Sequence, residues 1–417
     1  MHLDVVVMLM RDTELLRGLL RVEDPWDVTE SMLDLERSRV DVRLEWKGPG
    51  RCPSCGRECP KHDHRERTWR DLDLCGDQLF LHALVPRVDC AEHGVVTVAV
   101  PWSAGRSEFT ERFERITIAL IREMSVAAVS RRMAVSWDQV DAIMMRAVER
   151  GRTRQQPRLV RHLGIDEKAI KKGHRYFTLV SDLDAGVVLF VGHGRKRATI
   201  DAFWAGLSRE QLAAVEGVAM DMWQPYFDST ITFVPDAASK IVFDRFHVTA
   251  YLTKAVDLTR RAMMRDRSLN RTALKGTKYS WLRATQNMDR SERRELADLR
   301  SEYRQLGRAW AIKESFTEFW RYRRESSARA FFAGWFNWAT HSRLPQLVSV
   351  AYTLKRHFEN IVTYVRKPIS NAMAEGLNSK IQMLKYRAHG YRNDKRFEAV
   401  SLFHLGGLDL SPTHSKS

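Results

Sequence analysis

This sequence lacks a long apolar run, a signal peptide and cysteines outside one short segment, and each absence excludes a class of protein. No apolar run approaches the roughly 18 residues that a membrane-spanning helix requires. The start of the chain has no basic n-region and carries Asp4 among its apolar residues, unlike a secretory signal. All five cysteines fall between residues 52 and 90, and in a reducing cytosol such a cluster favours metal binding over disulfides. We therefore expect a cytoplasmic protein.

Acidic residues are scarce relative to basic ones. The 417 residues include 52 Asp and Glu against 68 Lys and Arg, which gives a formal net charge of +16. This excess favours a polyanionic partner, usually nucleic acid and less often an anionic membrane surface. A basic enzyme that does not bind nucleic acid is the alternative. At about 150 residues per domain, the length predicts two to four domains.

Two residue pairs have the spacing of zinc ligands. Cys52 and Cys55 form a CxxC pair, Cys90 and His93 form a second pair with the same spacing, and a glycine follows each pair. Three thiolates and one imidazole make a closed tetrahedral site, which is typical of structural zinc. With a short strand predicted at 78–85, we expect a zinc ribbon. Three nearby residues are alternative ligands: Cys59, His62 and His64.

A helix-turn-helix is predicted next. Apolar residues recur at helical spacing over 111–123, and Ser125 is placed to cap a short helix over 126–133. Ser136 and Gln139 form a capping box that opens the second helix. We expect this second helix to enter a DNA major groove, although similar helical hairpins occur in unrelated protein cores.

The second helix is predicted to end at about Arg150, with Gly151 as its C-terminal glycine. We expect Gln139 and Arg146 to contact bases. Five arginines with no acidic residue between them are expected to contact phosphates instead: Arg150, Arg152, Arg154, Arg158 and Arg161.

The hydrophobic pattern then changes to that of strands. Three short apolar runs separated by turns predict consecutive antiparallel strands: 163–167, 176–181 and 187–191. An amphipathic helix over 200–215 and two further strands follow, and these strands end at Asp221 and Asp244. This is the order of a ribonuclease H-like core, in which the first strand lies beside the fourth. Asp166 and Asp221 would then lie side by side.

A third carboxylate is expected on a later helix. One polar stripe at helical spacing crosses an otherwise apolar segment: Asn371, Glu375, Asn378 and Gln382. A glutamate within a stripe of amides suits a metal-binding wall better than a solvent-exposed face. Three carboxylates can hold two Mg²⁺ or Mn²⁺ ions about 4 Å apart for phosphodiester chemistry. An ordinary surface charge is the alternative for each acid taken alone.

Several motifs together resemble a known family. They are Gly-Ile-Asp166-Glu, Met-Asp221-Met-Trp, Phe-Asp244-Arg-Phe-His247 and Asn-Ala-Met-Ala-Glu375-Gly-Leu-Asn-Ser-Lys. With the zinc knuckles and the helix-turn-helix, they are similar to a DDE transposase of bacterial insertion sequences, of the ISL-three (ISL3) family, over about residues 15–408. His93 stands where a cysteine is common, which leaves the fourth zinc ligand open.

The resemblance implies a ribonuclease H-like catalytic domain, a divalent metal and an N-terminal part that recognises terminal inverted repeats in double-stranded DNA. It implies a catalytic triad of Asp166, Asp221 and Glu375. It also implies supporting roles for four residues: Asp244 and His247 of a D-x-x-H motif, Asn371 and Asn378. A homodimer on paired DNA ends, able to join them to target DNA, is expected of a bacterial protein that is nucleoid-associated when bound to DNA.

These observations predict a multidomain α+β protein. Because 154 positions separate Asp221 from Glu375, an all-helical insertion should interrupt the catalytic core. The expected parts are a zinc-ribbon region at 1–100, a helix-turn-helix at 101–150, a basic linker at 151–162, a core at 163–248 and 366–410, an insertion at 249–365 and a disordered tail at 411–417. Two alternatives remain: a ribonuclease H-like nuclease or resolvase, and a domesticated zinc-containing DNA-binding regulator.

Overall fold

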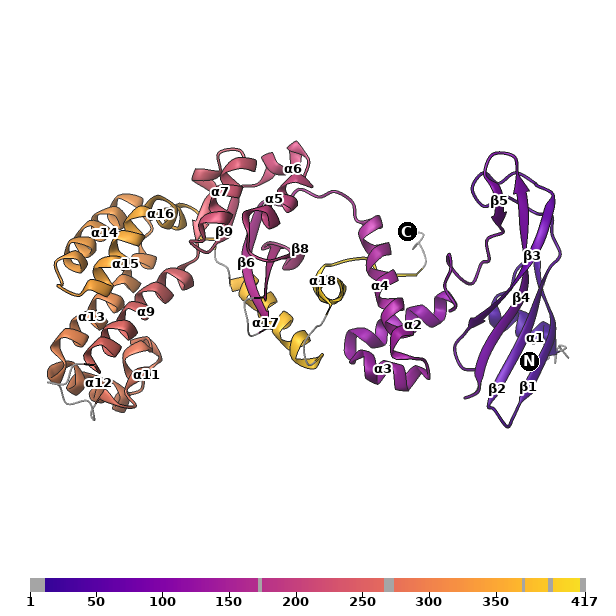
Figure 1. Ribbon diagram of the computed structural model, residues 1–417, viewed down its shortest axis with the longest axis horizontal. Coiled ribbons are helices and arrows are strands. Elements are labelled where there is room, and N and C mark those ends of the chain that lie inside the picture. Colours follow the sequence, from indigo (N-terminus) through magenta and orange to yellow (C-terminus); the bar gives the residue numbers. More distant parts are fainter. Residues whose placement is uncertain (1–11, 172–174, 266–273, 370–371, 389–392, 413–417) are drawn as a thin grey trace, which may run out of the picture. The chain divides into compact units, whose positions relative to one another are not determined.

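The computed structural model describes residues 12–171, 175–265, 274–369, 372–388 and 393–412 (Figure 1). They form two compact units: the chain up to Gln155 together with the segment that begins at Leu408, and Gln156–Gly407. Asn371 and residues 413–417 lie outside the described residues, so the predictions made for them stay predictions. Among the described residues, no helix has the length and apolar character needed to cross a membrane.

The first unit begins with a helix and a five-stranded sheet. The elements are α1 (Asp12–Leu20), β1 (Trp26–Asp34), β2 (Arg39–Trp46), β3 (Lys61–Arg70), β4 (Gln78–Cys90) and β5 (Gly94–Thr97). The strand order is β1-β2-β4-β3, with β5 paired to β4, and only the β2–β4 pair among them is parallel. Trp26 and Trp69 are buried in the core of this sheet. The predicted strand at 78–85 is confirmed as part of β4, which continues to Cys90.

Three helices follow: α2 (Glu111–Glu123), α3 (Val126–Met133) and α4 (Trp137–Arg154). The predicted caps are confirmed, because the Ser125 hydroxyl accepts from the backbone N–H of Ala128 and Ser136 forms a capping box with Gln139. Ala134 makes the turn between α3 and α4 in the left-handed region, at φ 51°. The predicted helix pair is therefore present.

The predicted end of α4 at Gly151 was wrong. The helix continues to Arg154, and Gly151 lies buried inside it. A Cβ at this position would lie 2.8 Å from the Cβ of Leu408, so the glycine serves close packing rather than termination. Arg154 donates to the Ser411 carbonyl at 2.6 Å, and Leu410 is buried. The segment that follows the second unit thus packs onto α4.

The second unit is built on another five-stranded sheet. Its strands are β6 (His162–Lys171), β7 (Arg175–Asp182), β8 (Val187–His193), β9 (Gly217–Met220) and β10 (Ile241–Phe243), in the order β10-β9-β6-β7-β8. The pairs β6–β7 and β7–β8 are antiparallel, whereas β9 lies parallel to both β6 and β10. The prediction that the first strand lies beside the fourth is confirmed.

Helices flank this sheet: α5 (Arg197–Ala205), α6 (Arg209–Ala214), α7 (Gln224–Phe233), α8 (Ala237–Lys240), α17 (Ala372–Arg387) and α18 (Asp394–Leu405). The single helix predicted over 200–215 was wrong. It is divided into α5 and α6, because Ser208 opens a new helix through a capping box with Gln211.

A helical region lies between β10 and α17 (Figure 1). It contains α9 (Arg245–Met263), α11 (Lys278–Leu282), η1 (Thr285–Asn287), α12 (Arg290–Glu302), α13 (Arg304–Ser315), η2 (Phe316–Arg321), α14 (Glu325–Thr340), α15 (Pro345–Arg356) and α16 (Phe358–Arg366). Most of its aromatic residues fill its core, and Phe316, Phe319 and Trp335 are buried, whereas Trp338 is exposed.

Candidate functional site

Sheet register gathers three aspartates at one edge of the second unit. Met220 of β9 pairs with Ile165 of β6 and with Phe243 of β10. An aspartate directly follows each of these three paired residues: Asp166, Asp221 and Asp244. Because the three strands are parallel neighbours, these carboxylates occupy adjacent positions across the sheet.

Helix α17 brings the glutamate to the same edge. The Asn378 side-chain amide donates a hydrogen bond to the Asp166 carboxylate, so α17 is secured to β6. Burial raises the pKa of Glu375, and the charges of Asp244 and Asp166 raise it further. The stripe predicted on this helix therefore faces the aspartates through Glu375 and Asn378.

The D-x-x-H motif lies at the start of α9. The Asp244 side chain is almost fully buried and accepts a hydrogen bond from the backbone N–H of Phe246, which caps the helix. One turn later, His247 Nδ1 lies 3.4 Å from Asp221 Oδ2. The motif thus joins the end of β10 to the aspartate that follows β9.

The electrostatics of this carboxylate cluster favour a bound cation. Burial raises the pKa of Asp166, and the Asp221 carboxylate adds to the shift, while His247 and Asn378 oppose it. Burial likewise raises the pKa of Asp244, which the Asp166 charge raises further. Hard divalent cations prefer such oxygen ligands and would remove the repulsion. The donor set therefore fits Mg²⁺ or Mn²⁺.

Sequence reasoning missed a second group beside these acids. Glu167 follows Asp166 in β6, and its carboxylate lies 3.4 Å from the Arg195 guanidinium. Arg195 in turn contacts the rings of Tyr176 and Trp223. The sequence signal was only the adjacency of Glu167 to Asp166 and of Trp223 to Asp221, because Arg195 comes from a separate loop.

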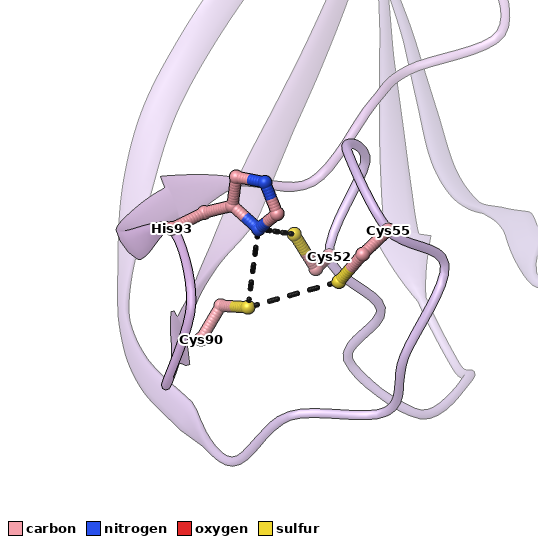
Figure 2. Close-up of side chains that lie close together, drawn as sticks. All are labelled: Cys52, Cys55, Cys90 and His93. Atoms are coloured by element: carbon pink, nitrogen blue, oxygen red, sulfur yellow. Dashed lines mark hydrogen bonds between the residues drawn. The ribbon is translucent and has the colours of Figure 1, made fainter.

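The two zinc knuckles converge at one end of the first sheet, as Figure 2 shows. Cys52 Sγ lies 3.8 Å from His93 Nδ1, Cys90 Sγ lies 3.6 Å from the same nitrogen, and Cys55 Sγ lies 3.8 Å from Cys90 Sγ. A tetrahedral zinc with bonds of about 2.3 Å to sulfur separates its ligands by about 3.8 Å. The predicted ligand set therefore has the dimensions of a zinc site.

Backbone turns place these ligands. Gly56 and Gly94 adopt φ values of 71° and 66°, which lets each knuckle fold back on itself. A hydrogen bond from His93 lowers the pKa of the Cys90 thiol to about 6, and the backbone N–H groups of Glu92 and His93 contribute. Cys90 is thereby prepared to bind metal as a thiolate.

Among the described residues, this is the one group of three or more potential ligands whose donor atoms all lie within 4.8 Å of one another. The carboxylates of the second unit are spaced more widely. The alternative ligands Cys59, His62 and His64 fall outside the group. The Cys59 thiol instead donates to the Arg57 carbonyl at 3.5 Å, and His62 pairs with Asp63.

The arginines predicted to contact DNA are mostly engaged within the protein. Arg146 and Arg150 both pair with the buried Glu114 of α2, at 2.6 and 3.0 Å. Arg154 pairs with Asp409, and Arg158 with Asp182. Two others are exposed: Arg152 and Arg161. The acidic partners Glu114, Asp182 and Asp409 lie far from these arginines in the sequence, so the run of basic residues alone did not reveal the ion pairs.

Gln139 is also engaged, since its side-chain oxygen accepts from the Ser136 backbone N–H. A polar cavity of about 1270 Å³ adjoins it in the first unit. Its lining includes four arginines: Arg65, Arg67, Arg70 and Arg106. The lining also includes Glu66, Glu108 and Glu111, so the start of α4 opens onto a cavity lined by charges of both signs.

Three family models match successive parts of the chain. A model described as a zinc finger of the transposases of IS204, IS1001, IS1096 and IS1165 matches residues 48–93. One described as a helix-turn-helix domain of transposase family ISL3 matches 98–148, and one described as a transposase, of the ISL3 type, matches 163–401.

Curated proteins are similar over almost the whole length. The transposase for insertion sequence element IS1557 of Mycobacterium tuberculosis is 29% identical, over 95% of this chain and 96% of its own. The transposase for insertion sequence element IS1001 of Bordetella parapertussis is 29% identical, over 91% of this chain and 93% of its own.

Proposed function

Because this chain belongs to the ISL3 family of transposases, we propose that it binds the terminal inverted repeats of an insertion sequence and catalyses metal-dependent DNA strand cleavage and strand transfer. One observation carries the proposal. Asp166 lies on β6 and Asp221 directly follows the neighbouring parallel strand β9, while α17 carries Glu375 and is held to Asp166 by Asn378.

We assign 163–248 and 366–407 to a ribonuclease H-like core and 249–365 to a helical insertion within it; the predicted end of the core at 410 is shortened because the segment from Leu408 belongs to the first unit. The strand order β10-β9-β6-β7-β8, with β6 central, supports the core, and the helices α9 to α16 support the insertion. A zinc-ribbon region at 1–100, a helix-turn-helix domain at 101–154, extended to the observed end of α4, and a basic linker at 155–162 complete the proposed organisation. The matches at 48–93 and 98–148 support the first two parts.

Asp166, Asp221 and Glu375 are proposed to hold two Mg²⁺ or Mn²⁺ ions. When bound, such ions activate the attacking oxygen and stabilise the leaving oxygen of a phosphodiester. The protein contributes the orientation of the acids. His247 contacts Asp221 and Asn378 contacts Asp166, so each aspartate is held by one neighbouring side chain. The Cys52, Cys55, Cys90 and His93 set would hold one structural Zn²⁺.

DNA recognition is assigned to α4, with Gln139 and Arg146 near base edges. The five arginines from Arg150 to Arg161 are assigned to phosphates. Arg152 and Arg161 are the best placed of these, because both side chains are exposed to solvent. Arg146 would have to exchange Glu114 for a base.

Cleavage at two DNA ends and their joining require two active sites near one another. We therefore propose a homodimer on paired terminal repeats, which also engages target DNA. A nuclease or resolvase with the same core, and a domesticated regulator that binds without cutting, are the alternative functions.

The test uses labelled duplexes that end in the inverted repeat, identified in the DNA flanking the gene, with scrambled duplexes as controls. Mg²⁺-dependent cleavage and joining of the repeat alone is expected. Binding without cleavage would favour the regulator. Cleavage without joining, or without preference for the repeat, would favour the nuclease.

A further inference from the structure

An exposed aromatic ring lies beside the aspartates and has no place in the proposed triad. Trp223 follows Asp221 by two residues, and its side chain is 36% exposed. Its backbone N–H donates to the Asp221 carbonyl at 2.7 Å. The position of this ring is therefore tied to that of the aspartate.

A cation is stacked against the same ring. The Arg195 guanidinium carbon lies 4.8 Å from the centroid of Trp223 and 4.3 Å from that of Tyr176. The indole N–H of Trp223 donates to the Arg195 carbonyl at 3.0 Å. Cation–π contacts and this hydrogen bond fix the indole and the guanidinium relative to each other. The pair is thus organised before any ligand arrives.

The Arg195 guanidinium forms a long ion pair with Glu167 that engages only part of its hydrogen-bonding capacity. Its Nη1 lies 3.4 and 3.5 Å from the two Glu167 oxygens, whereas a strong charge-assisted hydrogen bond spans about 2.7–2.9 Å. A guanidinium has five N–H donors, and this contact involves one nitrogen. Burial and the negative charges of Asp221 and Asp166 disfavour the ionised form of Glu167, so its carboxylate is a weaker ion-pair partner for Arg195. Arg195 therefore retains donors for an anion.

We propose that Arg195 and Trp223 form a nucleotide-binding platform for the DNA residue next to the cleaved bond. Trp223 stacks on its base, and Arg195 contacts its phosphate. This inference rests on the proposed function, because it assumes a DNA end among the carboxylates. The carboxylate cluster itself repels a phosphate, and a fixed arginine beside it offsets that repulsion. Aromatic stacking accepts any base once it is unpaired.

The experiment places 2-aminopurine at the nucleotide next to the cleaved bond in a repeat duplex. Binding is measured by its fluorescence in Ca²⁺, so that no cleavage is required. Trp223→Ala should weaken binding about 10-fold and abolish the fluorescence change, whereas Trp223→Phe should retain both. Arg195→Ala should weaken binding and reduce the salt dependence by about one phosphate contact, whereas Arg195→Lys should retain most of it. Trp338→Ala, which removes an exposed tryptophan of α14, is the matched control.

Two results would overturn the platform. One is an unchanged fluorescence signal and affinity in Trp223→Ala. The other is unchanged affinity with a raised Mg²⁺ requirement for cleavage, which would mean that Trp223 only holds Asp221. Since the fluorescence is recorded without cleavage, it tests the platform separately from the catalytic proposal. A wild-type protein that binds and changes fluorescence but never cleaves would count against the proposed function alone.

Discussion

The side-chain amide of Asn378 donates a hydrogen bond to the carboxylate of Asp166, across 212 positions of sequence. This contact secures α17 to the central strand of the second sheet. It also gives Asp166 a donor that lowers its pKa against the effect of burial. The Asn378 amide thus positions both Asp166 and α17, the helix that carries Glu375.

Asn378→Ala is expected to slow cleavage about 10- to 100-fold, the usual effect of losing a partner of a metal ligand. The Mg²⁺ concentration for half-maximal cleavage should rise. Gln382→Ala, on the same helix and exposed, is the control and should cleave normally. Cleavage rates across a Mg²⁺ titration check this, and equal effects of the two changes would remove the role given to Asn378.

Asp166→Asn, Asp221→Asn and Glu375→Gln should each reduce cleavage and joining by more than about 100-fold, because a metal ligand matters more than its outer partners. Each carboxamide keeps the side-chain shape and removes the charge that the cations need. Binding to the repeat should stay close to normal. Single-turnover cleavage and gel-shift binding measure the two properties. Near-normal cleavage by any one variant would exclude that residue from the site.

Burial raises the folded-state pKa of Asp166 and Glu375 above their ordinary values of 3.8 and 4.5. An acid with a raised folded pKa stabilises the fold fully below its unfolded pKa, and this contribution is lost as the pH rises through the folded pKa. Without metal, the thermal midpoint should therefore fall as the pH rises above these ordinary values and the two acids ionise.

Calorimetry in buffer from which Mg²⁺ has been removed by exchange, with the proposed zinc left in place, measures that decline. Asp166→Asn should make the decline smaller. At high pH, its midpoint should exceed that of the wild type by about 2–4 °C for each kcal/mol of unfolding free energy recovered. Mg²⁺ should restore the wild-type midpoint at high pH and have little effect at low pH. A midpoint that rises with pH in Mg²⁺-free buffer would show that other groups dominate.

Cys52→Ser and Cys90→Ser should each release about one zinc per chain and weaken binding to the repeat, because the first sheet loses a metal cross-link. Cys75→Ser is the control, since Cys75 is exposed and outside the ligand group. Elemental analysis and thermal unfolding check this outcome. Purified wild-type protein without zinc would contradict it.

Arg152→Ala with Arg161→Ala should weaken binding to every DNA sequence and flatten its salt dependence by about two phosphate contacts. Arg146→Ala should instead reduce the preference for the repeat, because it removes the proposed base contact. It should also lower the thermal midpoint, because it leaves the buried Glu114 with one fewer cation. Binding to repeat and scrambled duplexes across a salt series separates these effects. Unchanged repeat preference in Arg146→Ala would contradict the base contact proposed for it.

Local signals predicted the helix pair and the strand order well. The caps at Ser125 and Ser136 depend on residues three positions away, and the strands of the second sheet are bounded by short turns. The Cys52, Cys55, Cys90 and His93 group was identifiable because metal coordination restricts the spacing of its ligands. The end of α4 was missed because Gly151 has a tertiary partner, Leu408, that no local pattern reveals.

The candidate site was predicted only in part for the same reason. Asp221 and Asp244 directly follow β9 and β10, and Asp166 lies within β6, which pairs with β9, so their adjacency followed from the order of the strands. Arg195 lies on a loop after β8, and nothing in its own neighbourhood marks it as a neighbour of Glu167. The partners of the linker arginines were hidden similarly, since Glu114 and Asp409 lie well outside the linker.

The contact between Gly151 and Leu408 makes the DNA-binding unit discontinuous in sequence. The carboxylate-bearing unit is nested inside it, entered at Gln156 and left at Gly407. Two chain crossings therefore join the units, one at Gln155–Gln156 and one at Gly407–Leu408. Truncation after Gly407 would remove the residues that cover α4, although they follow the second unit in the sequence.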